Sequence, residues 1–158
     1  MALSERDRKQ DEELVLRFFA LANWPEGYRG NISDFLTDYM ELVTVKTTQQ
    51  FDLHMQREMF ETVFGLLNRS LGPDAFLRNR DGRFLGAVAP AYYEAVTQGV
   101  FRFRNELEKV SPQALAIALT SVRTDPIFLD NVGPGANSRR KLLGRIGKVK
   151  SSIEALLS

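Results

Sequence analysis

The residues of this sequence best suited to chemistry are basic, and the largest group lies near the C-terminus. No acidic residue occurs between Asp130 and Glu154, and basic residues recur along an expected helix. Such a helix can place a positive surface opposite an apolar stripe, which suits contacts to backbone phosphates. The alternative is the ordinary solvated face that an amphipathic helix needs. The candidate DNA contacts are Arg139, Arg140, Lys141, Arg145 and Lys148.

A second basic group surrounds a predicted tight turn at Asp81-Gly82. Basic residues that alternate with aromatic residues can hold a nucleic-acid backbone and stack on bases. A charged hairpin turn with no ligand is the alternative interpretation. The group consists of Phe76, Arg78, Arg80, Arg83 and Phe84.

Groups that could support catalysis are scarce. The absence of cysteine excludes disulfides, thiolate-ligated zinc and a thiol nucleophile. His54 is the only histidine, and one imidazole without a second ligand at a suitable spacing is typical of a structural or surface residue. Glu58 and Glu61 share a helix face, but no further ligand lies near them, which favours a solvated face. The sequence contains no Gly-rich phosphate loop. We therefore expect no catalytic residue, no metal site and no cofactor.

Composition places these residues in one folded domain, residues 1–158. The hydrophobic fraction of 44% and the charged fraction of 26% are ordinary for a globular protein. No apolar run is long enough to span a bilayer, and the first residues lack the apolar core of a signal peptide. These features predict a soluble, cytoplasmic protein without membrane contact. Residues 1–50 carry a net charge of −3 and residues 111–158 one of +4, which favours either internal pairing or a polyanionic partner.

Helical periodicity runs through nearly the whole sequence. Capping residues and Pro or Gly breaks predict helices from Ser4 to just before Trp24-Pro25, over 34–43, over 49–71, from Pro90, from Ser111-Pro112, and over 138–157. Gly99 makes continuation of the fourth helix beyond it doubtful. Residues 76–86 have the Asp-Gly signal of a short hairpin. The predicted fold is all-α: a compact bundle of about six helices with one short hairpin-like insert.

The order of these segments resembles the helical C-terminal portion of the ParB-like, GmrSD-type family, the modification-sensing part of type IV restriction systems. The similarity covers most of the chain. It is carried by residues 8–21, Tyr28, Phe35-Leu36 with Tyr39-Met40, residues 72–77, Asp125-Pro126 with Phe128-Leu129, Asn137-Ser138 and Arg145-Ile146. The family's Asp-Gly-Gln-Gln-Arg signature for nucleotide hydrolysis and its His-Asn-His nuclease module have no counterpart here. The resemblance therefore implies a helical module without catalytic residues.

Two functions follow as hypotheses. The first is a non-catalytic module of a restriction or phage-defence system that packs against a ParB-like NTPase domain or subunit and contacts DNA. The second is a helical protein–protein adaptor with no nucleic-acid role. A partner would cover apolar side chains of the first helix, which offers more apolar surface than one neighbour needs to cover. The candidate interface is Leu14, Phe18, Leu21 and Trp24.

Overall fold

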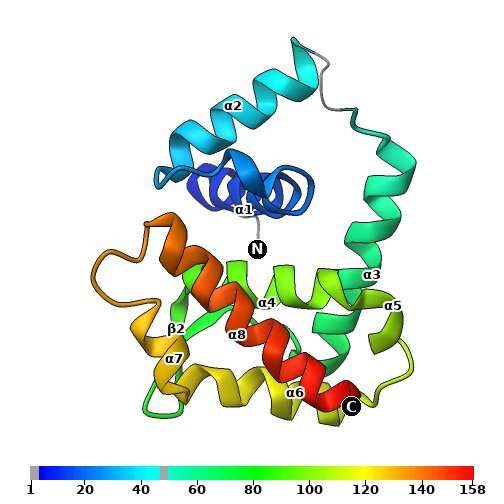
Figure 1. Ribbon diagram of the computed structural model, residues 1–158, viewed down its shortest axis with the longest axis vertical. Helices are drawn as coiled ribbons and strands as arrows, with labels where there is room; N and C mark the ends of the chain where they lie inside the picture. Colours follow the sequence, from blue (N-terminus) through cyan, green and yellow to red (C-terminus); the bar gives the residue numbers. More distant parts are fainter. Residues whose placement is uncertain (1–3, 47–49) are drawn as a thin grey trace.

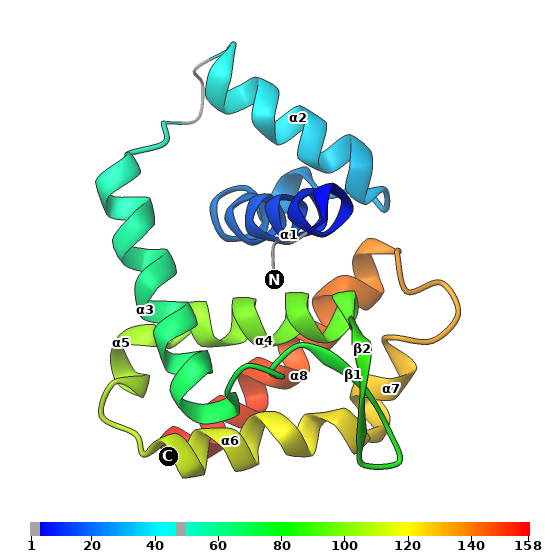
Figure 2. The same ribbon diagram turned by 180° about the vertical axis from the view of Figure 1, so that it is seen from behind.

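The computed structural model describes residues 4–46 and 50–158. Within these ranges the chain forms eight α-helices, two short 3₁₀ helices and one two-stranded antiparallel sheet (Figures 1 and 2). The α-helices are α1 (Glu5–Asn23), α2 (Ile32–Thr44), α3 (Leu53–Leu71), α4 (Pro90–Arg102), α5 (Arg104–Leu107), α6 (Pro112–Ser121), α7 (Pro126–Asp130) and α8 (Arg139–Leu157). The 3₁₀ helices are η1 (Pro25–Gly27) and η2 (Val122–Thr124), and the strands are β1 (Leu77–Arg80) and β2 (Arg83–Val88).

The fold is mostly helical, as the sequence predicts, but it is not purely α. The predicted hairpin forms a real pair of strands, and the described residues hold eight α-helices rather than about six. The additional helices are the short α5 and α7, which follow Phe103 and Asp125. Asp125 caps α7 by accepting hydrogen bonds from the backbone N–H groups of Ile127 and Phe128.

Side-chain caps fix where the long helices begin. Ser4 and Asp7 form a reciprocal capping box at the start of α1. The side chain of Asn31 accepts a hydrogen bond from the backbone N–H of Asp34 and so caps α2. Asp52 accepts a hydrogen bond from the N–H of Met55 and so begins α3 at Leu53. The predicted start of that helix at Gln49 lies outside the described residues.

Helix α4 is the centre of the larger core. Its residues from Tyr92 to Val100 are all buried, because α1, α3 and α8 pack around it. Gly99 lets α8 approach closely, since a Cβ at this position would lie 2.4 Å from Cγ1 of Val149. The helix therefore continues through Gly99 to Arg102, contrary to the expected weakening at that glycine.

A smaller core joins α1, α2 and the first turns of α8. The rings of Trp24 and Phe35 stack with centroids 5.7 Å apart. The hydroxyl of Tyr28 donates to the carbonyl of Asn137 at 2.6 Å, which ties the segment after η1 to the start of α8. This cluster holds α1 and α2 as a pair at one end of the molecule (Figure 1).

The hairpin turns through two residues with positive φ, Asp81 at 51° and Gly82 at 81°. Two such residues between paired strands are characteristic of a type I′ turn, which the sequence predicts from Asp-Gly. The side-chain oxygen of Asn79 accepts a hydrogen bond from the N–H of Gly82 at 3.1 Å. The turn therefore fixes where the flanking arginines of both strands lie.

Candidate functional site

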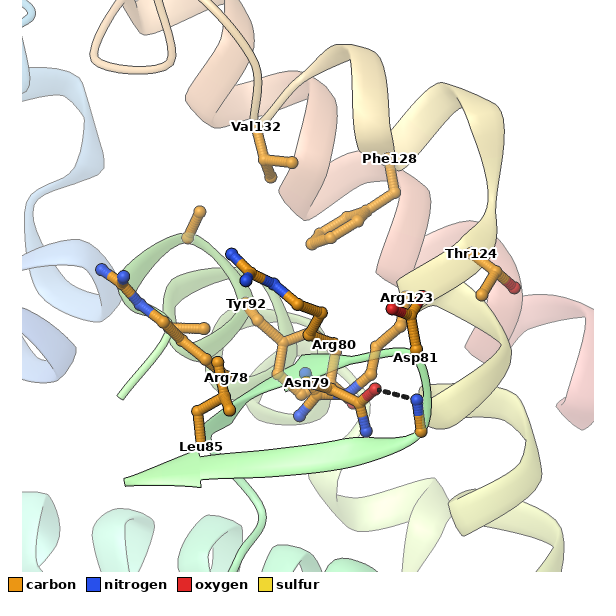
Figure 3. A pocket seen from close by; sticks show the side chains of 13 residues that line it. Arg78, Asn79, Arg80, Asp81, Leu85, Tyr92, Arg123, Thr124, Phe128 and Val132 are labelled. Atoms are coloured by element: carbon orange, nitrogen blue, oxygen red, sulfur yellow. Dashed lines mark hydrogen bonds between the residues drawn. The ribbon is translucent and has the colours of Figure 1, made fainter. Parts of the chain in front are cut away.

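A pocket of about 470 Å³ lies between the hairpin, the start of α4, η2 and α7. Its polar lining is dominated by three arginines, and its apolar wall includes Tyr92, Phe128 and Val132 (Figure 3). Phe128 is buried and is part of the larger core, so this wall belongs to the rigid part of the fold. The arginines are Arg78, Arg80 and Arg123.

Arg123 is the best-positioned of the three. Its guanidinium carbon lies 3.7 Å from the centroid of the Tyr92 ring, and its Nη2 donates to the carbonyl of Ala75 at 3.1 Å. Stacking on an aromatic face and a backbone acceptor together restrict a long side chain that would otherwise lose entropy on binding a ligand. The hydroxyl of Tyr92 in turn donates to the carbonyl of Leu119 at 3.0 Å. Burial raises the pKa of Tyr92, and the charge of Arg123 opposes that shift.

Arg78 and Arg80 complete the charged part of the pocket from the hairpin. Both are exposed, and in Figure 3 they leave β1 on the side where Phe128 and Val132 lie. Asp81 is the only acidic residue of the lining. Among the described residues, no ion pair involves any of the three arginines. Three unneutralised guanidinium groups against one carboxylate make this pocket suitable for an anion such as a phosphate.

The sequence identified only part of this site. It singled out Arg78 and Arg80 but missed Arg123 and Tyr92. Arg83 and Phe84 lie on β2 outside the pocket lining, although the Phe84 ring is 5.9 Å from the Arg123 guanidinium carbon. Arg123 lies more than forty residues after Arg80 and has no basic neighbours in the sequence, so no local pattern indicated it.

Four of the five basic residues that the sequence assigns to phosphate contact on α8 have partners within the chain. Arg139 donates to the carbonyls of Pro25 and Tyr28, and Nζ of Lys141 donates to the carbonyl of Asp130 at 2.6 Å. Nζ of Lys148 lies 2.9 Å from Oδ2 of Asp125. That interaction holds the pKa of Asp125 below its usual value. Arg140 is exposed.

Arg145 contradicts the prediction most directly, because it is only 3% exposed. Its guanidinium binds the carboxylate of Glu94 and the carbonyls of Asn131 and Ala136. Nη1 of Arg17 reaches the other oxygen of Glu94 at 2.9 Å, and its Nη2 binds Glu13. Arg145 therefore belongs to a buried ion cluster, Arg17–Glu94–Arg145, that joins α1, α4 and α8, and it cannot contact a phosphate in this packing.

The four residues predicted to form a partner interface on α1 pack into two different cores of the fold. Phe18 and Leu21 are buried in the two cores, and Leu14 and Trp24 are partly buried against them. These four residues therefore serve mainly internal packing. The apolar surface that α1 leaves open is instead on its Val15 side.

The histidine and the paired glutamates that the sequence singled out on α3 lie on an exposed face. The exposed His54 lies 3.3 Å from Glu58, and Arg57 pairs with Glu61, so this face of α3 is the solvated face that the sequence predicts. No group of three or more potential metal ligands occurs within residues 4–46 and 50–158. Within the same ranges, no helix has both the length and the apolar character needed to cross a bilayer.

Comparison with known proteins adds no relative. No family model, curated protein or solved structure matches this chain. The relation to the ParB-like, GmrSD-type family therefore stays a prediction from the order of sequence segments.

Proposed function

We propose that this chain is a non-catalytic binding module that contacts the phosphate backbone of DNA through its arginine pocket. The observation that carries this proposal is the set of Arg78, Arg80 and Arg123, three guanidinium groups around one pocket without an acidic partner in an ion pair. A guanidinium presents a planar fork of donors that matches two phosphate oxygens. The pocket replaces α8 as the expected site of DNA contact.

The family resemblance supplies a context for this activity. A module of a modification-sensing restriction system would hold DNA while a ParB-like NTPase partner provides the nucleotide chemistry. The chain itself would then hydrolyse neither ATP nor GTP. This context is part of the proposal and is tested separately, by asking whether such a partner co-purifies with the chain.

Binding to a fluorescein-labelled 20-base-pair duplex tests the DNA contact. Fluorescence anisotropy at several salt concentrations should show weak, sequence-independent binding that falls steeply with salt, because each neutralised phosphate releases condensed counterions. Replacing Arg78, Arg80 and Arg123 by Gln should weaken binding and flatten the logarithmic salt slope by roughly one unit for each lost contact.

Two control variants make the result specific to the pocket. Arg57→Gln removes one exposed arginine on α3 that lines no part of the pocket, and it should leave binding unchanged. Arg140→Gln does the same on α8 and tests the original prediction for that helix. Absence of DNA binding by the wild-type chain, or an equal loss in the controls, would overturn the proposal in favour of an adaptor with no nucleic-acid role.

A further inference from the structure

A second surface feature lies on the paired helices α1 and α2, away from the arginine pocket. A groove of about 460 Å³ runs between them and ends at Phe51. A neighbouring hollow of about 400 Å³ shares Leu16 and Met40 with it, so the two continue each other along the α1–α2 junction. In Figure 1 these helices form the end of the molecule opposite α6.

The groove is lined mainly by apolar side chains at helical spacing. Val15, Leu16 and Phe19 come from α1, and Tyr39, Met40 and Val43 come from α2. Val15 is 38% exposed and Met40 is 44% exposed, although both are large apolar residues. From Ile32 in the neighbouring hollow to Val43, α2 rises by roughly 16 Å, the length of about three helical turns. The surface thus matches one face of a docked amphipathic helix.

The charges beside the groove indicate which kind of helix fits. Among residues 4–46 and 50–158, Asp11 and Glu12 are its only charged lining residues, and no basic residue lines either hollow. Among the described residues, neither carboxylate takes part in an ion pair. The next acid, Glu13, lines the neighbouring hollow but is already bound to Arg17. Two unpaired carboxylates flanking an apolar groove select an occupant with positive residues beside its apolar stripe.

We propose that the α1–α2 groove is a docking site for a basic amphipathic helix of a partner protein. Leucine or similar side chains of the partner would enter between Val15 and Met40. The flexible thioether side chain of Met40 can adapt to partner side chains of varied shape. Lys or Arg side chains beside that stripe would approach Asp11 and Glu12. The inference goes beyond DNA binding, because the arginine pocket and this groove share no residue.

A synthetic 14-residue peptide with the sequence LKKLLKKLLKKLLK provides the probe. Its leucines recur at helical spacing, and its remaining positions are lysine. Titration into the ¹⁵N-labelled chain should produce saturable amide shifts that cluster on α1 and α2. Two control peptides test whether binding depends on positive charge and on helical spacing. LEELLEELLEELLE reverses the charge. LKLKLKLKLKLKLK keeps the composition of the probe, but its leucines alternate with the period of a β-strand. Both should bind more weakly than the probe.

Two double variants of the groove separate the contribution of its charges to peptide binding from that of its apolar surface. Asp11→Asn with Glu12→Gln should weaken binding of the probe about two- to tenfold, as expected for two partly exposed ion pairs. Glu58→Gln with Glu61→Gln changes the net charge equally on α3 and should have no effect. Val15→Thr with Met40→Gln keeps side-chain size but removes apolar surface, and should weaken binding about three- to tenfold.

Four results would overturn the proposal. One is no saturable binding of the probe, and another is a shift pattern centred on other elements. The third is self-association, measured by size-exclusion chromatography with light scattering, in which a second copy of the chain covers the groove. Retained binding in the Val15→Thr, Met40→Gln variant would also count against it. Arg80→Gln in the separate arginine pocket should leave peptide binding intact, which distinguishes this surface from the DNA site.

Discussion

Removing the charge of Glu94 should destabilise the fold severely. Its carboxylate accepts hydrogen bonds from Arg17 at 2.9 Å and from Arg145 on both the Nε and Nη2 atoms. Glu94 is 5% exposed, Arg17 is 7% exposed and Arg145 is 3% exposed. Water therefore cannot take the place of the Glu94 carboxylate when its charge is removed. Glutamine keeps the shape but leaves the buried guanidinium of Arg145 without a counter-charge and leaves Arg17 with only the half-exposed Glu13. Breaking a buried pair in this way typically costs about 3–5 kcal/mol.

That cost is a large share of the stability of a typical domain, about 5–15 kcal/mol. For a chain of this length it corresponds to a fall in Tm of roughly 6–20 °C. Urea unfolding followed by circular dichroism measures the free energy, and a thermal scan measures Tm. Glu61→Gln, which breaks an exposed pair on α3, is the matched control and should cost under about 1 kcal/mol.

A triple replacement separates charge burial from packing. Arg17→Met, Glu94→Leu and Arg145→Met together remove every member of the ion cluster while keeping apolar volume. Such replacements are often neutral or stabilising, because the desolvation cost of the charges disappears with them. The triple variant should therefore be more stable than Glu94→Gln alone. A Glu94→Gln variant within about 1 kcal/mol of the wild type would refute the reasoning.

Four further predictions concern packing and titration. Gly99→Ala should destabilise by about 1–3 kcal/mol in urea unfolding, because its Cβ would collide with Val149, and adding Val149→Ala should recover part of the loss. Gly147→Ala, also within a helix but with open space around the new Cβ, should instead stabilise by up to about 1 kcal/mol. Burial raises the pKa of all four tyrosines, so an ultraviolet titration should show their ionisation displaced above their ordinary pKa near 10, and stability should fall as pH rises beyond it. The Lys148 contact lowers the pKa of Asp125, so an NMR titration should place its midpoint below 3.8 and Lys148→Gln should raise it; the stability from this contact is present above the unfolded pKa and lost as pH falls through the folded value.

The sequence predicted local features of the fold better than long-range ones. The caps at Ser4 and Ser111 and the Asp-Gly turn depend on neighbours within a few residues, and all three occur as expected. The sequence predicted a short turn at Phe128-Leu129 but did not count it as a helix, because α7 is barely longer than one turn and depends on its cap and on packing of Phe128.

The ion cluster and the pocket depend on contacts that are distant in sequence. Arg145 was grouped with the surface residues of α8, yet it follows Leu142 by three positions and precedes Val149 by four, so it lies on the buried stripe. Glu94 gave a similar signal as the only acid in the apolar run of α4. Neither position indicated its partner, and nothing local linked Arg123 to the hairpin. These pairings exist only once the helices have packed.

The central position of α4 also governs how the chain can fold during synthesis. Helix α8 supplies the surface that packs on Gly99 and the guanidinium that neutralises Glu94 beside Arg17. At a translation rate of roughly 5–20 residues per second, several seconds pass between the appearance of α4 and that of α8. During that interval the side of α4 that α8 covers in the folded chain stays exposed. The carboxylate of Glu94 then lacks its ion pair with Arg145. A nascent chain stalled before residue 139 would therefore be a preferred substrate for chaperones, and the native core would close only after α8 emerges from the ribosome.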